Sequence, residues 1–353
     1  MPSDRKPAGA EAATVRARVP LRLGLAGGGT DLAPYCDEHG GAVLNTTIDR
    51  YAYAFIEPSH DRQVHFVAPD LEQEESFPAD LYAIREASLK LHAGVTRRMI
   101  EQFGGGVLPP LRVTSYVDAP AGSGLGSSSA LVVALVEAFT TLLHAPLGPY
   151  DVAHLAYEIE RIDLRLAGGK QDQYAATFGG TNFIEFLAGD RVIVNPLRIP
   201  SPVLSELETS IVICFTGVSR RSEAIITEQQ QLMRTLGGSN LESLHQLKRD
   251  AIEMKDALLR GQVSRMSEIL NRSWTAKKRT ASGISTAQIE TLYGVACENG
   301  ATAGKVSGAG GGGFMMFIVP PPARVRVIRA LNRSGGSATG VHFTSDGAES
   351  WVV

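Results

Sequence analysis

The length, composition and charge of the chain limit what it can be before any motif is considered. It has 353 residues, enough for one large domain or two that share a cleft, and its 44% hydrophobic and 20% charged content is ordinary for a globular protein. Lysine and arginine number 34 against 37 aspartates and glutamates, and the resulting net charge of −3 gives no reason to expect nucleic-acid or membrane-surface binding.

The cysteines and the apolar segments exclude further classes. Cys36, Cys214 and Cys297 are far apart and lack the spacing of a zinc site, which favours a reducing cytoplasm. No apolar run reaches the roughly 20 residues that cross a bilayer. Residues 1–13 lack the apolar core of a signal peptide, so we expect a disordered tail there in a cytoplasmic protein.

The first half of the chain predicts strands that lead into glycine-rich turns. Apolar residues alternate from Val15 to Leu25, as in a half-buried strand, and a glycine-rich segment follows at 27–31. The run 131–139 is apolar on nearly all sides, which predicts a buried helix. Other elements predicted here are strands at 51–56 and 111–117 and helices at 88–103 and 151–166.

The second half predicts a separate unit. The segment 200–208 is polar and contains proline, which indicates a boundary between domains. A glycine cluster at 304–313 runs directly into an apolar strand at 314–319. Strands and helices mix without strict alternation, so we predict an α+β fold with domains at 14–204 and 205–353. Other elements predicted here are a strand at 211–215 and helices at 240–259, 263–274 and 286–299.

The segment Pro120–Ser129 is the strongest local signal in the chain. Three alternating glycines precede three serines, and a predicted strand and helix flank the loop. Glycine lets backbone N–H groups approach an anion closely, and the N-terminus of the following helix attracts negative charge. This pattern predicts a phosphate cradle, with a serine-rich helix cap after a flexible turn as the alternative.

Three common nucleotide-binding signatures are excluded. Gly308–Gly313 matches the dinucleotide pattern of glycines, but it precedes a strand instead of opening a helix. The chain has no P-loop lysine motif and none of the protein-kinase motifs. An ATP-binding protein with this sequence must therefore hold the phosphates with another kind of loop.

Three separated glycine-rich segments, in the order found here, resemble the motifs of the GHMP kinases. They are Pro20–Asp31, Pro120–Ser129 and Gly304–Gly313, and the resemblance extends from about Val15 to the C-terminus. It implies two domains, the first like domain 2 of ribosomal protein S5 and the second ferredoxin-like, with ATP and a sugar in the cleft between them.

Within this superfamily, Leu21–Asp31, Tyr157–Arg161 and Gln171–Gly180 resemble the bacterial heptose 7-phosphate kinases. The resemblance implies transfer of a phosphoryl group from ATP to the anomeric C1 hydroxyl of D-glycero-α-D-manno-heptose 7-phosphate. The product would be the 1,7-bisphosphate, a precursor of GDP-heptose for surface polysaccharides.

The same resemblance implies a catalytic pair. Asp172 matches the catalytic aspartate of the family, whose carboxylate would accept the proton of the sugar hydroxyl. Arg22 matches the basic residue that would keep this carboxylate ionised. A helix-capping or turn aspartate is the alternative for Asp172.

The resemblance also assigns ATP and Mg²⁺ to particular residues. Ser127 or Ser128 would offer a hydroxyl oxygen to Mg²⁺ and Glu160 a carboxylate, with Glu158 as its competitor. Both glutamates could instead be solvated charges on an amphipathic helix. The residues expected around the ATP phosphates are Pro120, Gly122, Ser123, Gly124, Leu125, Gly126, Ser127, Ser128 and Ser129.

Acceptor binding is expected from the first and third motifs and from Lys170 and Gln173. Thr30 and Asp31 occupy positions that bind sugar hydroxyls in related kinases, and a carboxylate suits polyols because it accepts two hydrogen bonds. The residues expected to bind the substrate are Gly28, Gly29, Thr30, Asp31, Lys170, Gln173, Gly308, Ala309 and Gly310.

A phosphate already present on the sugar would need cations, and the sequence leaves several open. The candidates are Lys170, Lys277, Lys278, Lys305 and Arg50, although the basic segment 275–279 could equally be a solvated helix face.

Two other functions therefore stay open, a kinase of a free sugar such as heptose or L-fucose and a non-catalytic sugar sensor. The sensor is disfavoured because Arg22, Asp172, Glu160 and the loop serines are all present. A monomer and a homodimer are equally compatible with the sequence.

Overall fold

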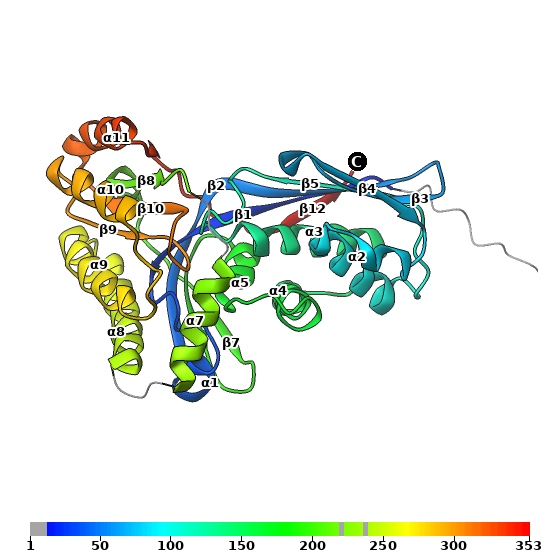
Figure 1. Ribbon diagram of the computed structural model, residues 1–353, viewed down its shortest axis with the longest axis horizontal. Coiled ribbons are helices and arrows are strands. Elements are labelled where there is room, and N and C mark those ends of the chain that lie inside the picture. The colour runs from blue at the N-terminus through cyan, green and yellow to red at the C-terminus, as the bar shows by residue number, and fades with distance from the viewer. Residues whose placement is uncertain (1–12, 219–221, 236–238) are drawn as a thin grey trace, which may run out of the picture.

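The computed structural model describes residues 13–218, 222–235 and 239–353. Within these residues the chain forms a large sheet and a small sheet, which lie in different parts of the molecule (Figure 1). Residues 1–12, which make up most of the expected N-terminal tail, are outside the described part. Helices and strands are mixed in both parts, so the predicted α+β class is confirmed.

The large sheet is organised around one long strand, β2 (Gly41–Pro58). One end of β2 pairs with β5 and the other with β6, while β1 runs antiparallel along nearly its whole length. The strand order is β12-β1-β2-β5-β3-β4, with β6 and β7 continuing from the far end of β2. The bounds are β1 (Val15–Ala26), β3 (Gln63–Ala68), β4 (Gln73–Pro78), β5 (Leu111–Val117), β6 (Thr181–Phe186), β7 (Val192–Pro196) and β12 (Glu349–Val352).

Helices cover one face of the large sheet, and α3 (Ser127–Leu143) is the central one (Figure 1). It packs on β1 and β2 with one side and against neighbouring helices with the others. This explains its apolar sequence, because Val132, Leu135 and Val136 have no exposed surface. The neighbouring helices are α2 (Lys90–Phe103), α4 (Pro149–Glu158) and α5 (Gln171–Phe178), and the short α1 (Tyr35–His39) follows β1.

The small sheet is antiparallel, with the order β11-β8-β10-β9. One face of this sheet packs in a second core that includes Val212, Leu292 and Phe317. Residues of the opposite face, Ile211, Ile213 and Met316, belong to the same core as the large sheet. The bounds are α6 (Ser201–Ser210), β8 (Ile211–Phe215), α7 (Ser222–Thr235), α8 (Ser239–Leu259), α9 (Val263–Lys278), α10 (Ala287–Glu298), β9 (Ala303–Val306), β10 (Phe314–Ile318), α11 (Arg324–Arg333) and β11 (Ser337–Thr339).

Three features depart from the sequence-based expectation. The helix expected at 151–166 ends at Glu158 and continues as a π-helical turn, Ile159–Asp163. The polar boundary segment 200–208 forms most of helix α6. The last strand, β12, pairs with the start of β1 in the large sheet, so the unit expected at 205–353 is not closed on itself. Pairing of β12 covers an edge of β1 that would otherwise be open.

The second and third glycine-rich segments are joined by hydrogen bonds where the two parts of the molecule meet. Ser307 donates its hydroxyl to the Gly124 carbonyl at 2.9 Å, and the Phe314 N–H donates to the Ser123 carbonyl at 2.8 Å. A side chain at Gly124 would overlap the Ser307 carbonyl, and the φ of Gly124 is +78°. Only glycine permits this approach.

Gly124→Ala should therefore lower the free energy of unfolding by about 2–4 kcal/mol, through backbone strain and the overlap with Ser307. The matched control is Gly105→Ala, where φ is +69° and nothing lies within 4 Å of the added carbon. This control should lose only about 1 kcal/mol. Urea denaturation measures the free energy of unfolding of both variants. Equal losses in the two variants would show that the close contact between Gly124 and Ser307 does not add to stability.

Candidate active site

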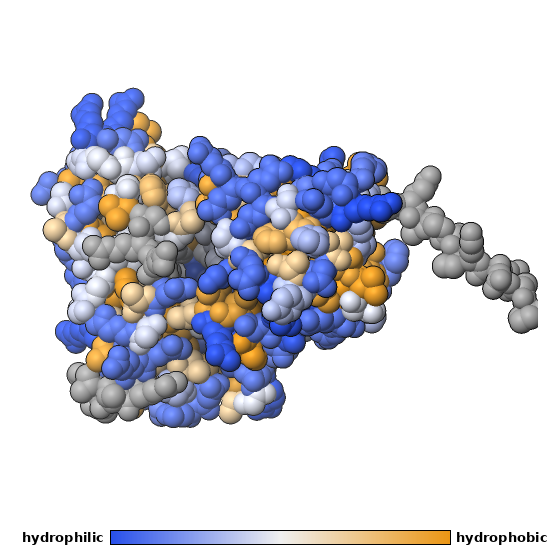
Figure 2. Space-filling model, turned by 45° about the vertical axis from the view of Figure 1, so that its right-hand side comes forward, coloured by the Kyte–Doolittle hydropathy of each residue, from blue (hydrophilic) through white to orange (hydrophobic). Residues whose placement is uncertain are grey.

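A cavity of about 660 Å³ lies where the N-terminal end of α3 meets the helices of the second part. Its walls include the glycine loop, the turn after β1, the start of α5, and residues of α7 and α9. Figure 2 shows this face of the molecule hollowed between its left-hand and right-hand parts. The three glycine-rich segments, far apart in the sequence, all reach this cavity.

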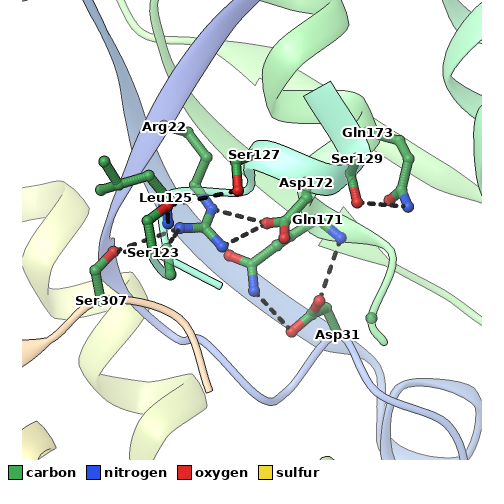
Figure 3. Close-up of polar contacts among 12 residues, drawn as sticks. Arg22, Asp31, Ser123, Leu125, Ser127, Ser129, Gln171, Asp172, Gln173 and Ser307 are labelled. Carbon is green, nitrogen blue, oxygen red and sulfur yellow. Dashed lines mark hydrogen bonds and ion pairs between the residues drawn. The ribbon is translucent and has the colours of Figure 1, made fainter. Parts of the chain in front are cut away.

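The centre of the site is an ion pair between Arg22 and Asp172 (Figure 3). Nε and Nη2 of Arg22 lie 2.7 and 2.6 Å from Oδ1 of Asp172, and Nη1 donates to the Gly124 carbonyl at 2.7 Å. The arginine side chain is 4% exposed and the aspartate 23%, so the carboxylate is the partner that opens to the cavity. Gly126 makes room for it, because an added carbon there would lie 3.3 Å from Asp172 Cγ.

The expected phosphate loop divides into residues that face the cavity and residues that support it. Gly122, Gly124 and Gly126 adopt positive φ angles of 69°, 78° and 76°, and α3 begins immediately afterwards. Ser123 and Leu125 have no exposed surface, and the Leu125 N–H donates to the Ser123 hydroxyl at 3.4 Å. The loop residues that line the cavity are Ala121, Gly122, Gly124, Gly126, Ser127, Ser128 and Ser129; Pro120 is not among them.

Glu160 and Ser128 place a carboxylate and a hydroxyl next to each other at the cavity wall. The Ser128 hydroxyl donates to Glu160 Oε1 at 3.2 Å, and the amide of Gln173 holds Oε2. Glu160 is placed by the π-helical turn, an irregularity that is frequent at functional sites. Its competitor Glu158 pairs instead with Arg98 at 2.7 Å and does not line the cavity.

This donor set fits Mg²⁺, which prefers oxygen ligands and commonly takes only one or two carboxylates, with water and phosphate completing its shell. The described residues contain no cluster of three or more His, Cys, Asp or Glu side chains of the kind that holds a metal by protein ligands alone. A cation at Glu160 would thus depend on phosphate oxygens from a nucleotide for its remaining ligands.

The turn after β1 carries a second carboxylate, Asp31. It accepts hydrogen bonds from the Gly29 N–H at 3.0 Å and from the Gln171 N–H and side-chain amide at 3.2 and 3.1 Å. Gln171 directly precedes Asp172 in the chain. Its hydrogen bonds to Asp31 therefore connect the Asp31 carboxylate to the residue next to Asp172 (Figure 3). Thr30 is fully buried and its hydroxyl accepts the Ala42 N–H, which gives it a role in the turn itself.

The candidate cationic side chains differ in the partners that they have among the described residues. Lys170 lies 2.6 Å from Asp190 and 3.4 Å from Asp37 and does not line the cavity. Lys278 lies 3.3 Å from Glu290. Arg50 donates to a backbone carbonyl and stacks over a phenylalanine ring. None of these three side chains lines the main cavity, whereas Lys277 does.

Lys277 and Lys305 lie half-buried beside the turn after β1. Lys277 Nζ donates to the Gly28 carbonyl at 3.1 Å. Burial lowers the pKa of Lys277 to about 8, although Asp31 acts in the opposite direction. Burial, Lys277 and Arg22 together lower the pKa of Lys305 to about 7.

The remaining expected residues lie at or near the site in different ways. Gly29, Asp31, Gly308 and Ala309 line the main cavity, whereas Gly310 does not. Gln173 is fully buried, donates hydrogen bonds to Ser129 and Glu160, and does not line the cavity.

Sequence analysis missed several cavity residues. Gln171 could have been found from its position beside Asp172. Glu223 and Gln229 come from α7, for which no helix was predicted, and nothing in the local pattern points to their placement.

Comparison with known proteins shows the family of the chain. The family model for the N-terminal domain of GHMP kinases matches residues 90–180, and the model for the C-terminal domain matches residues 254–337. A D-glycero-alpha-D-manno-heptose 7-phosphate kinase from Campylobacter jejuni is 43% identical over 342 residues, covering 96% of this chain and 99% of the relative.

Solved structures show the same relationship. A D-glycero-D-manno-heptose 1-phosphate kinase from Bacteroides thetaiotaomicron has a TM-score of 0.81 at 42% identity, covering 96% of this chain and 99% of that one. A galactokinase from Lactococcus lactis shares the fold with a TM-score of 0.75 at 17% identity, over 95% of both chains. Among the described residues, none of the helices combines the length and apolar character needed to cross a membrane. Matching motifs, fold and relatives together show that the chain belongs to the GHMP kinase family.

Proposed function

We propose that this chain uses ATP and Mg²⁺ to phosphorylate the anomeric C1 hydroxyl of D-glycero-α-D-manno-heptose 7-phosphate, in the cytoplasm. The observation that carries the proposal is the Arg22–Asp172 ion pair, which lies between the phosphate loop and the turn that carries Asp31. The likeness to a heptose 7-phosphate kinase over 96% of the chain supports the choice of acceptor.

Asp172 is the proposed base. As the sugar oxygen bonds to the γ-phosphorus and the bond from phosphorus to the ADP oxygen breaks, the hydroxyl proton passes to the Asp172 carboxylate. Arg22 orients the carboxylate through the ion pair and lies close enough to stabilise charge on the moving phosphoryl group. Because Arg22 also binds the Gly124 carbonyl, the base and the phosphate loop keep a constant spacing.

The nucleotide would be held by the loop and the metal site. The first N–H groups of α3 have no partners within the helix, so they are available to phosphate oxygens. Ser128 and Glu160 would hold Mg²⁺, which supplies positive charge to the phosphates during transfer. Asp31 and Gln171 line the other side of the cavity, where they can accept from and donate to sugar hydroxyls.

Two other kinds of acceptor are possible, a differently phosphorylated heptose, which a relative suggests, and a free sugar, which the sequence leaves open. The Bacteroides structure is named as a heptose 1-phosphate kinase, which differs in where the acceptor already carries its phosphate. A free heptose or L-fucose would need no cations for a phosphate. An ADP-release assay with heptose 7-phosphate, heptose 1-phosphate, heptose and L-fucose separates these, and NMR of the product gives the position of the new phosphate.

The proposal expects turnover with heptose 7-phosphate and a product phosphorylated at C1. Turnover with only a free sugar would show that the acceptor is wrong. Absence of ADP release with all four sugars would favour the non-catalytic sensor.

Asp172→Asn should lower kcat by about 10²–10⁴-fold, because the amide cannot accept the hydroxyl proton. The KM for ATP should stay near the wild-type value, since the amide retains the shape of the side chain. Asp151→Asn, on the exposed start of α4 and outside the cavity, is the control and should keep full activity. A kcat for Asp172→Asn within tenfold of wild type would show that Asp172 is not the base.

Glu160→Gln should raise the Mg²⁺ concentration needed for half-maximal activity by at least about tenfold, because a charged oxygen ligand is lost. Glu158→Gln, two residues earlier and outside the cavity, is the matched control and should leave the Mg²⁺ dependence unchanged. Steady-state rates at fixed ATP over a Mg²⁺ series measure both variants. An equal response of the two variants would remove Glu160 from the metal site.

A further inference from the structure

We propose that Lys277 and Lys305 form a subsite for the phosphate group that the acceptor sugar already carries. This subsite makes the chain select a sugar phosphate over the corresponding free sugar. The inference rests on the proposed function, because it concerns the acceptor end of the same cavity.

Both lysines come from the second part of the molecule and meet the end of β1. Lys277 is in the last turn of α9, and Lys305 is on β9. A side-chain carbon at Gly29 would lie 2.9 Å from Lys277 Nζ, and one at Gly24 would lie 3.9 Å from Lys305 Nζ. The glycines of the first motif thus leave open the space that the two ammonium groups face.

The lysines lie on the acceptor side of the site. They border a small cavity that adjoins the main one, with Gly28, Gln171 and Trp274 among its walls. Arg22, Gln171 and Lys277 border both cavities, whereas the phosphate-loop serines border only the main one. No residue of the phosphate loop borders the small cavity, so a phosphate bound by Lys277 and Lys305 would lie away from the nucleotide loop.

The charges around Lys305 are unbalanced. Its charged neighbours are Lys277 and Arg22, both cations, and Arg22 already has its carboxylate partner in Asp172. Within the described residues no carboxylate pairs directly with Lys277 or Lys305, whereas Lys170 and Lys278 each have one. Buried charges are normally compensated, and a phosphate dianion would compensate these two.

The same cations would act differently if they served the transferred phosphoryl group. In that case they would contribute to every acceptor, phosphorylated or not. If they serve the acceptor's own phosphate, their removal affects only phosphorylated sugars. Comparing a sugar with its phosphate therefore decides between the two roles.

The first experiment measures binding by isothermal titration calorimetry in the presence of Mg²⁺ and a non-hydrolysable ATP analogue. Heptose 7-phosphate, heptose 1-phosphate and heptose are the probes, and Lys277→Met, Lys305→Met and the control Lys278→Met are the variants. Lys278 is one residue from Lys277 but pairs with Glu290. Methionine keeps most of the length of the lysine side chain without its charge, and thermal unfolding checks that each variant is folded.

Wild type should bind a heptose phosphate on the order of 10–100-fold more tightly than heptose, the usual range for a charged hydrogen bond. Lys277→Met and Lys305→Met should each remove most of this preference without changing the affinity for heptose, and Lys278→Met should keep it. Whichever of the 1- and 7-phosphates loses affinity in the variants identifies the position of the bound phosphate. Equal binding of heptose and both phosphates by wild type would overturn the subsite.

Proton uptake gives a second readout. Lys305 faces Lys277 and Arg22, and Lys277 faces Asp31, with pKa values of about 7 and 8 for the two lysines. A bound dianion raises both pKa values, so binding at about pH 8 should take up protons and weaken as the pH rises further. Heats in buffers of different ionisation enthalpy measure the uptake, which Lys305→Met should reduce. Unchanged uptake in that variant would contradict the subsite.

Turnover separates failure of this inference from failure of the proposed function. If the lysine variants lose kcat equally with heptose and its phosphates, the lysines act on the transferred group, and the inference fails while the kinase assignment stands. If wild type phosphorylates no heptose phosphate, the proposed function fails, and the binding comparison still decides whether the subsite exists.

Discussion

The buried guanidinium of Arg22 is the interaction on which the site depends. It joins three distant parts of the chain, because it starts on β1, pairs with Asp172 at the start of α5 and donates to the carbonyl of Gly124 in the phosphate loop. Arginine can make these contacts together because its planar guanidinium group carries several N–H donors that point in fixed directions. Removing the guanidinium would leave the Asp172 carboxylate without its ion-pair partner, whereas the Gly124 carbonyl would keep the hydrogen bond from the Ser307 hydroxyl.

Backbone contacts between glycine segments surround this interaction. Gly124 and Ser307 touch through their main chains, and Gly126 lets Asp172 approach the loop. Each contact needs a residue without a side-chain carbon, which is why the three glycine-rich motifs meet in space although they are separated in the sequence. The cavity is therefore formed by both parts of the molecule and not by either sheet alone.

The distribution of compensated and uncompensated charge distinguishes the regions of the site. Glu160 accepts hydrogen bonds from Ser128 and Gln173 and lies 3.7 Å from the Arg161 guanidinium, so these three side chains hold its carboxylate at the cavity wall. Lys277 and Lys305 form a cationic wall on the other side of Arg22. A kinase that transfers a phosphoryl group from a nucleotide to an anionic acceptor needs two separate charged regions, since both substrates carry phosphate.

The sequence by itself determined the α+β class, the buried helix after the phosphate loop, the family resemblance and the positions of Arg22, Asp172 and Glu160 in motifs. These follow from periodicity and motif order, which are local properties of the chain. Only the tertiary structure decided that Lys170 is an ion-pair partner of Asp190, that Thr30 supports its own turn, and that Lys277 and Lys305 border the small cavity beside the main one. The same holds for the π-helical turn at Glu160 and for the return of β12 to the first sheet. The physical reason is that the environment of a charge, and the partner of an edge strand, come from residues far away in the sequence, which no local pattern specifies.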